Sequence, residues 1–460
     1  MSTSRPPPPP LTRIDRMTRK FFALTAALAM TTMLAGCGIF GGGEGKKPKT
    51  PVLGQRIPIL TAETGAEVDP TLEVVPVTVP AEQVNPEWAQ PGGNATKSMG
   101  HVALGQQLGV AWDRKIAGST KKARLAAGPV VGGGRVYVID VDAEIHAYDL
   151  KTGAPAWTAV LSDKGGNKAS LFGGGVSYSN GKVFATNGVG DAAAFDAGNG
   201  SQLWKVRPGG PLRGAPSVGS DAVYVMSQDN QLFALKETNG ELIWTASGSL
   251  ENAAVFGVGA PAIGQGTVVA GFSSGELTAY RYENGRAVWQ DSLSRTSITT
   301  SVASLVDIDA SPVIDQGRVY AVGQGGRMVA MDILTGQRLW ELNIAGIETP
   351  WVAGEWLFLV TDDAKLLCIA RNSGRIRWQT QLTRWKNVKK KSKPIGWSGP
   401  ILAGGRLILT NTEGQVVNVA VDTGKVGSIT KLGDTIYAAP VVADNTLLVL
   451  TDKGKLVAYR

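Results

Sequence analysis

Short runs of alternating character, rich in β-branched and aromatic residues, recur from about residue 110 to the C-terminus. Examples are Val136-Tyr137-Val138, Val319-Tyr320-Ala321 and Leu407-Ile408-Leu409, each of which follows a turn residue. This composition and alternation are typical of short strands that turn one face towards a core. The chain is therefore predicted to be all-β.

The runs begin at a regular signal. A proline is followed five residues later by a turn residue and then by a run, and one copy has Val176 in place of the proline. An interval this constant indicates an internal repeat. The eight pairs are Pro129/Gly134, Val176/Gly181, Pro216/Asp221, Pro261/Gly266, Pro312/Gly317, Pro350/Glu355, Pro400/Gly405 and Pro440/Asn445.

A hairpin follows most of these starts. The stretch AYDLKTGAPAW at 147–157 returns as AMDILTGQRLW at 330–340, with a Trp four residues after the turn Gly. Gly suits the positive-φ position of the turn, and the preceding Asp, Asn or Thr can cap it. The Trp is predicted to pack one repeat against the next. The pairs are Gly153/Trp157, Gly200/Trp204, Gly240/Trp244, Gly285/Trp289, Gly336/Trp340 and Gly374/Trp378, and Gly424 is followed by Ser428 instead.

Each repeat thus holds four predicted strands, and four strands in roughly 40–50 residues is the signature of a propeller blade. The last repeat stops at Ala458-Tyr459-Arg460, before an outermost strand, whereas Trp112 lies in a strand that no repeat precedes. We therefore predict one domain, an eight-bladed β-propeller of four-stranded antiparallel blades at residues 87–460. The N-terminal strand is predicted to close the ring and remove its open edge.

The first 86 residues differ in composition. From Met17, two basic residues and an apolar stretch at 21–33 lead to Leu34-Ala35-Gly36-Cys37, and this stretch is too short for a stable membrane span. Residues 1–36 are predicted to be a signal peptide, and 1–16 resemble an upstream extension. Residues 37–86 are predicted to form an extended or disordered tether, although alternation at 72–80 leaves open an added strand.

Leu-Ala-Gly-Cys at 34–37 resembles the bacterial lipobox. The resemblance implies that Cys37 becomes the mature N-terminus and carries acyl chains, which would attach the protein permanently to a membrane. Gly38 follows it where Asp would imply retention, so the implied location is the outer membrane, facing the periplasm.

Charge and reactive residues exclude several classes of function. The net charge is +8, or +4 without residues 1–36, which does not suggest a nucleic-acid partner. With only His101 and His146, an all-His metal site is excluded and a His-based triad lacks support. No Gly-x-Ser-x-Gly, phosphate-binding loop or Cys-x-x-Cys occurs. The sequence predicts neither catalysis nor a cofactor nor a metal.

The repeat resembles that of the pyrroloquinoline quinone (PQQ) dehydrogenases, which are eight-bladed propellers. Those enzymes stack PQQ against a vicinal disulfide, and Cys368 has no neighbouring cysteine. It occupies the small-residue position of Ala147 and Ala330, which predicts a buried strand residue. A ligand-binding or redox propeller that uses its central channel remains the alternative.

A lipoprotein with this propeller is similar to the BamB family, a subunit of the machine that assembles β-barrels in the outer membrane. In that family a Leu-Arg-Gly loop before a blade's Pro, and an Asp-x-Asp-x-x-Pro loop two blades later, bind the POTRA domains of the central subunit, BamA. This chain has Leu212-Arg213-Gly214 before Pro216 and Asp307-Ile308-Asp309 before Pro312. Both loops join an outer strand to the next inner strand, so both are predicted to open on one face.

The resemblance implies a role for each of these residues. Leu212 would be an apolar anchor, Arg213 a forked donor to the partner, and Asp307 and Asp309 acceptors or groups that hold Arg213. Pairing that only orders the loops is the alternative, and Gly210 stands where the family often has a second Leu. Other implied partners are the machine's lipoproteins and unfolded barrel clients at the propeller edges.

One further loop is strongly basic. Arg384, Lys386, Lys389, Lys390, Lys391 and Lys393 gather between Trp385 and Trp397. Contact with anionic lipid or polymer of the envelope is one interpretation, and a solvated loop that counters an acidic rim is the other.

Overall fold

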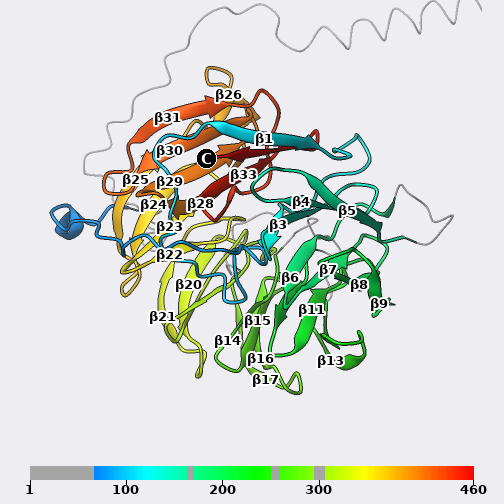
Figure 1. Cartoon of the computed structure of the whole chain (residues 1–460). Coiled ribbons are helices and arrows are strands. Elements are labelled where there is room, and N and C mark those ends of the chain that lie inside the picture. Colours follow the sequence, from blue (N-terminus) through cyan, green and yellow to red (C-terminus); the bar gives the residue numbers. More distant parts are fainter. Residues whose placement is uncertain (1–66, 163–169, 213, 250–258, 295–305) are drawn as a thin grey trace, which may run out of the picture. The chain divides into compact units, whose positions relative to one another are not determined.

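A computed structural model describes residues 67–162, 170–212, 214–249, 259–294 and 306–460. Its strands form eight antiparallel four-stranded sheets and one separate two-stranded hairpin. The sheets follow one another around a central axis (Figure 1), and the predicted eight-bladed propeller is confirmed. The predicted signal peptide, Cys37 and Arg213 lie outside the described residues.

The inner strand begins directly after the start proline in six blades, whereas β6 begins at Val176 itself and β28 begins at Trp397, before Pro400. Proline has no N–H to donate, so it suits the residue just before a strand. The inner strands of blades 1 to 8 are β2 (Val130–Gly132), β6 (Val176–Ser179), β10 (Ser217–Gly219), β14 (Ala262–Gly264), β18 (Val313–Asp315), β22 (Trp351–Ala353), β28 (Trp397–Ala403) and β32 (Val441–Ala443).

The two middle strands of each blade are the most buried, because the neighbouring blades cover both of their faces. The second strands are β3 (Arg135–Ile139), β7 (Lys182–Thr186), β11 (Ala222–Met226), β15 (Thr267–Gly271), β19 (Arg318–Gly323), β23 (Trp356–Val360), β29 (Arg406–Asn411) and β33 (Thr446–Leu450). The third strands are β4 (Glu144–Asp149), β8 (Ala192–Asp196), β12 (Gln231–Lys236), β16 (Glu276–Arg281), β20 (Arg327–Asp332), β24 (Lys365–Ala370), β30 (Gln415–Ala420) and β34 (Lys455–Tyr459).

The outer strands are largely exposed apart from their tryptophans. They are β5 (Pro155–Val160), β9 (Gln202–Val206), β13 (Leu242–Ser247), β17 (Ala287–Ser292), β21 (Arg338–Leu342), β25 (Ile376–Gln381), β31 (Val426–Lys431) and, in blade 8, β1 (Val110–Lys115). β1 pairs antiparallel with β34, with Trp112 opposite Ala458. The predicted closure by the N-terminal strand is therefore confirmed.

Each outer-strand tryptophan contacts the next blade, as predicted. A Cβ atom on Gly336 would lie 2.5 Å from Cγ of Trp289, so this turn needs Gly for close approach as well as for its φ of 70°. The indole Nε1 atoms also donate to carbonyls of the next blade at 2.8–3.1 Å. The pairs are Trp112–Leu150, Trp157–Ala197, Trp204–Glu237, Trp244–Tyr282, Trp289–Ile333, Trp340–Arg371 and Trp378–Val421.

A small residue faces each tryptophan from the third strand. These residues are Ala147, Ala194, Ala234, Ala279, Ala330, Cys368 and Ala458. In blade 7, Asn418 takes this position and its Nδ2 donates to Oγ of Ser428 at 2.9 Å. Small size is therefore required only where a tryptophan must fit.

Residues 83–104, which we name the axial segment, pass from blade to blade across one end of the central channel. Its hydrogen bonds reach the inner strand, or the turn after it, of every blade in order. The contacts are Asn85–Asp444, Trp88–Val131, Ala89–Tyr178, Gln90–Val218, Ala95–Ile263, Thr96–Ile314, Gly100–Trp351 and Val102–Leu402.

The residues before the axial segment also lie on the propeller. Asp69 caps the short 3-10 helix η2 (Pro70–Leu72), and Val68 forms an isolated parallel bridge with Ile376 of β25. The part of the expected tether that is described thus runs along blade 6. No helix in the described ranges has the length and apolar character to cross a membrane.

Candidate functional site

The connections from outer to inner strands open at the end of the ring opposite the axial segment. All blades share one strand order, so these connections share one face, which we name the loop face. The loop with Leu212 precedes blade 3 and the loop with Asp307 and Asp309 precedes blade 5. The structure therefore brings both sequence-predicted loops to the same end of the propeller.

Leu212 is fully buried at 0% exposure, in the core between blades 2 and 3. It forms a bridge with Ser227, and the neighbouring Pro211 carbonyl accepts a hydrogen bond from the amide of Gln228 at 2.7 Å. On the other side, the Gly214 carbonyl accepts from Oγ1 of Thr186 at 2.7 Å. Leu212 thus anchors the loop to its own blades rather than offering apolar surface, and both ends of the loop around residue 213 are fixed.

Asp307 and Asp309 are also buried, at 1% and 7% exposure. Oδ2 of Asp309 accepts a hydrogen bond from Nε2 of Gln324 at 2.9 Å, and the Asp307 carbonyl accepts from the Gln324 amide. Ile308 between them packs in the core of blades 4 and 5. The loop is therefore rigidly placed, and its carboxylates lie inside the loop face rather than projecting from it.

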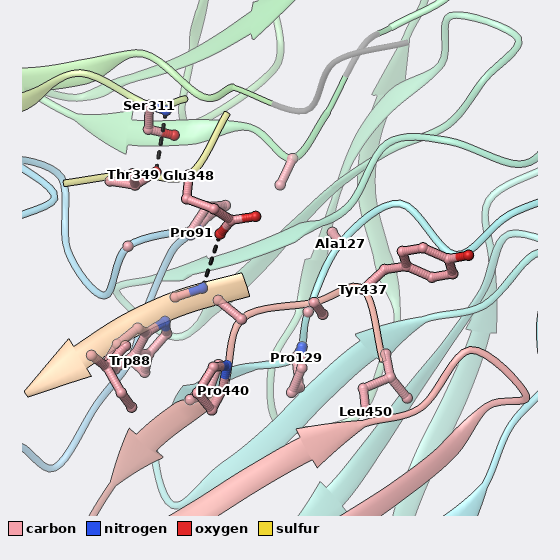
Figure 2. Close-up of a pocket in the computed structure, with 18 of the residues that line it drawn as sticks. Trp88, Pro91, Ala127, Pro129, Ser311, Glu348, Thr349, Tyr437, Pro440 and Leu450 are labelled. Carbon is pink, nitrogen blue, oxygen red and sulfur yellow. Dashed lines mark hydrogen bonds between the residues drawn. The ribbon is translucent and has the colours of Figure 1, made fainter. Parts of the chain in front are cut away.

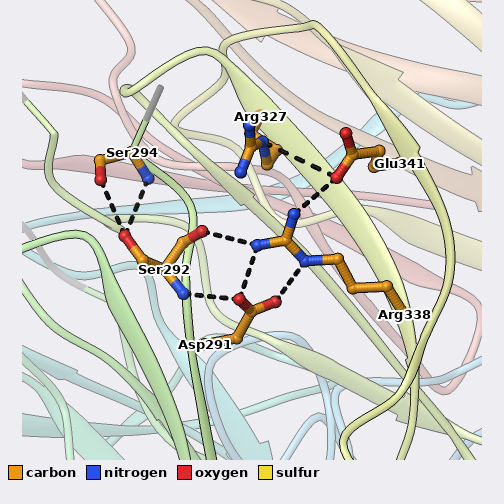
Figure 3. Close-up of polar contacts among 6 residues, drawn as sticks. All are labelled: Asp291, Ser292, Ser294, Arg327, Arg338 and Glu341. Carbon is orange, nitrogen blue, oxygen red and sulfur yellow. Dashed lines mark hydrogen bonds and ion pairs between the residues drawn. The ribbon is translucent and has the colours of Figure 1, made fainter. Parts of the chain in front are cut away.

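An ion network holds the start of this connection. Figure 3 shows Arg338 of β21 between Asp291 of β17 and Glu341. Its Nε and Nη2 donate to the two carboxylate oxygens of Asp291 at 2.6 Å each, and Nη1 reaches Glu341 at 2.6 Å. The hydrogen bonds to Asp291, and to a lesser extent the one to Glu341, raise the pKa of Arg338. Such a bidentate pair adds geometric specificity, and it ties blade 4 to blade 5 just before the loop that carries Asp309.

A cavity of about 210 Å³ lies on the axis between the two ends of the ring. Trp88 of the axial segment stacks on Trp351 at 5.8 Å between ring centroids. Connections of the loop face form the walls, including Pro129, Glu348 and Tyr437 (Figure 2). Asp309 and Ala215 line the same cavity, so it adjoins both predicted loops.

Two ionisable side chains of this cavity carry no signal in the sequence. Nζ of the buried Lys97 donates to Oγ of Ser217 at 3.1 Å, and burial lowers the pKa of Lys97 to about 7. The Glu348 side chain is half-buried and lines the cavity. Because protein atoms surround its carboxyl group, desolvation raises the pKa of Glu348 to about 7. The amide of Gly399 donates to Glu348 Oε2 at 3.0 Å. Neither residue lies in a repeat motif, so only the folded ring reveals them.

One group in the described residues has the geometry of a metal site, formed by Asp140, Glu144 and His146. However, Oδ1 of Asp140 accepts hydrogen bonds from the amides of Asp142 and Glu144, and Oδ2 lies 3.0 Å from Nε2 of His146. Asp140 therefore caps its own turn, as Asn187 does in blade 2. These contacts explain the cluster without an ion.

Cys368 lies at 0% exposure in β24, facing Trp378, which confirms the prediction of a buried strand residue. Burial raises the pKa of its thiol, so the thiolate is disfavoured. Cys37 and Cys368 are the two cysteines of the sequence, so no pair of adjacent cysteines occurs in it.

The chain was compared with models of known protein families and with individual known proteins. The family model described as "Outer membrane protein assembly factor BamB" matches residues 98–168, 142–380 and 382–460. The chain belongs to the BamB family. It is 25% identical over 354 residues to the BamB of Shewanella oneidensis, covering 75% of this chain and 87% of that protein. It is 29% identical to the Burkholderia pseudomallei BamB, covering 74% and 85%.

Solved structures agree on the fold. The crystal structure of BamB from Moraxella catarrhalis matches with a TM-score of 0.65 and 18% identity, covering 77% of this chain and 100% of that one. A europium-containing methanol dehydrogenase matches with a TM-score of 0.64 and 16% identity, covering 81% and 98%. The BamB and methanol dehydrogenase structures thus share the propeller, and the fold by itself does not separate them.

Proposed function

We propose that this BamB-family protein is a lipid-anchored, non-catalytic scaffold of the outer-membrane β-barrel assembly machine. It binds the POTRA domains of a BamA-like subunit through the loop face and thereby aids the insertion of barrel proteins. Cys37 carries the lipid, which keeps the propeller at the periplasmic side of the outer membrane.

One observation carries the partner site. Two loops that are nearly a hundred residues apart, at 211–216 and 307–312, reach the same face, and both are held by the core. Preorganised loops lose little entropy on binding, so rigid placement favours a docking site. Leu212 and Asp309 fix the loop backbones, and Arg213 supplies the forked donor for a partner carboxylate or carbonyl. Asp307 supports the second loop from inside.

The test is co-purification of the intact lipoprotein from its own membranes, with mass spectrometry of the bound proteins. Wild type is compared with Arg213→Glu, with Asp309→Asn and with the double variant. We expect a POTRA-containing barrel protein to be lost from Arg213→Glu and the double variant. Asp309→Asn, which keeps the size of the side chain, should weaken capture less.

The matched control is Lys425→Glu, which reverses a charge on an exposed hairpin turn at the opposite face. It should capture the partner as wild type does. Thermal unfolding of each variant checks that the propeller is intact. If wild type captures no POTRA-containing protein, or if Lys425→Glu loses it equally, the loop face is not the docking site.

A further inference from the structure

An additional hairpin interrupts the repeat between blades 6 and 7. Its strands β26 (Trp385–Asn387) and β27 (Ser392–Pro394) pair only with each other. We name residues 384–394 the basic hairpin, and Figure 1 labels its strand β26 at the edge of the ring. Because it lies in an outer-to-inner connection, it belongs to the loop face.

The basic hairpin concentrates the charge of the protein. It holds six Lys and Arg residues and no acidic residue, whereas the whole chain has a net charge of +8. All six cationic side chains are exposed. Lys386 pairs with Glu413 at 3.0 Å, but within the described ranges no ion pair reaches the other lysines, which are Lys389, Lys390, Lys391 and Lys393.

The basic hairpin carries an exposed apolar residue at its tip and two tryptophans at its base, which is not typical of a loop that only contacts solvent. Val388 is 68% exposed at the tip, directly before three lysines. At the base, the Arg384 guanidinium lies over the ring of Trp385 at 5.1 Å, and Nε1 of Trp397 donates to the Thr383 carbonyl. An apolar tip, flanking cations and half-buried tryptophans are the composition of side chains at a membrane–water interface.

An acidic rim does not account for this charge. Glu413 is the one acidic group that forms an ion pair with the hairpin among the described residues, and it neutralises only Lys386. Four exposed lysines on a short hairpin, without an ion pair to any described residue, instead match a surface with a high density of phosphate groups.

We propose that the basic hairpin docks on the phosphate headgroups of an anionic lipid membrane, with Val388 at the depth of the headgroups. The proposal rests on the lipid anchor at Cys37, which holds the propeller at high effective concentration beside the bilayer. Docking would also turn the loop face, and with it the partner site, towards the membrane surface.

The experiment uses the full lipoprotein reconstituted in vesicles of phosphatidylcholine, with or without about 30% phosphatidylglycerol. Flotation first confirms that the protein is anchored. Trypsin cleavage after Lys389, Lys390 and Lys391 is then followed by mass spectrometry, with cleavage after the exposed Lys121 and Lys122 as internal reference. We expect the anionic lipid to slow hairpin cleavage about tenfold at low salt, and high salt to remove the protection.

Variants separate lipid docking from other causes. Lys386→Gln, Val388→Ser, Lys393→Gln keeps the three cleavage sites but removes two charges and the apolar tip, so its protection should fall. A Lys151→Gln, Lys425→Gln variant removes two exposed charges elsewhere, and should keep full protection.

Equal cleavage in neutral and anionic vesicles would overturn the proposal. So would protection that appears only when a protein partner is added, because that would assign the hairpin to a protein contact. Failure of lipid anchoring is distinguishable, because the protein would then not float with the vesicles. Failure of partner docking would leave the cleavage pattern unchanged.

Discussion

The interfaces between blades fall into two kinds. At seven of them a tryptophan of one blade packs on the turn glycine of the next and donates to its backbone. The interface between blades 7 and 8 has Ser428 at the tryptophan position and Asn418 at the small-residue position. There, Asn418 accepts from Nε of Arg406, whose Nη2 donates to the Gly105 carbonyl.

Topology explains the difference. A tryptophan needs a hairpin turn on the next blade, between the third and the outer strand. In blade 8 the outer strand is β1, from the other end of the chain, so β1 and β34 meet through backbone hydrogen bonds between Gly109 and Arg460 instead of a turn. The chain that enters the ring at residues 102–109 supplies the contacts that a tryptophan makes elsewhere. Closure by the N-terminal strand thus replaces the tryptophan contact with polar contacts at one interface, while the buried apolar residues of blades 7 and 8 still share one core.

The largest effect is expected from removing a tryptophan. Trp289→Ala should lower the free energy of unfolding by about 3–5 kcal/mol, because it leaves a cavity and an unpaired carbonyl at Ile333. Trp289→Phe keeps most of the apolar contact and should cost less. Urea unfolding monitored by circular dichroism measures both, and equal losses would show that the indole hydrogen bond dominates the interface.

A turn glycine should come next. Gly336→Ala places a methyl group 2.5 Å from Trp289 and keeps a positive φ of 70°, so we expect a loss of about 2–4 kcal/mol. Gly317→Ala in the same blade has a φ of 79° and open space around it, so it should lose only about 1 kcal/mol. The same chemical unfolding assay compares them. A similar cost at both sites would mean that backbone strain, and not the tryptophan, requires Gly336.

The axial cavity should also respond to pH, because Glu348, in the connection before blade 6, accepts a hydrogen bond from Gly399 of blade 7. Its pKa is about 7 in the folded protein against 4.5 ordinarily, so the folded state keeps a proton that the unfolded chain loses between these values. This contribution to stability is present below about pH 4.5 and is lost as the pH rises through 7.

Glu348→Gln should therefore reduce the fall in unfolding free energy between about pH 5 and pH 7 by roughly 1–3 kcal/mol. Lys97 does not interfere, because its lowered pKa affects stability above about 7. Unfolding at both pH values, in wild type and variant, measures the difference. An identical pH dependence in the two proteins would show that Glu348 ionises normally.

The smallest effect is expected from grafting the missing residues into blade 7. Asn418→Ala with Ser428→Trp recreates the pair found in the other blades, but blade 8 offers no turn to receive the indole. The unfolding free energy should change by no more than about 0.5 kcal/mol. A gain of more than about 1 kcal/mol would mean that the N-terminal chain can serve as a receiving surface.

The architecture was largely predictable because its signals are local. Start residues, hairpins and tryptophans repeat at short range, and Trp112 with no repeat before it predicted the closure. In blade 7 the sequence has Asn418 and Ser428 at the positions that hold a small residue and a Trp in the other blades, and this substitution marks the interface between blades 7 and 8. Such features act within one or two blades, so their spacing is sufficient to read them.

The axis was not predictable in the same way. The axial segment has no period, so nothing in its sequence indicates that Trp88 and Lys97 reach the channel or that Leu212 turns inward. Those positions depend on eight connections meeting at one place, and each connection differs in length and composition. The sequence by itself determined the blades, their number and their closure, because these follow from local repeats. Only the tertiary structure decided which side chains share the axial cavity and the loop face, because long-range geometry sets burial and charge there.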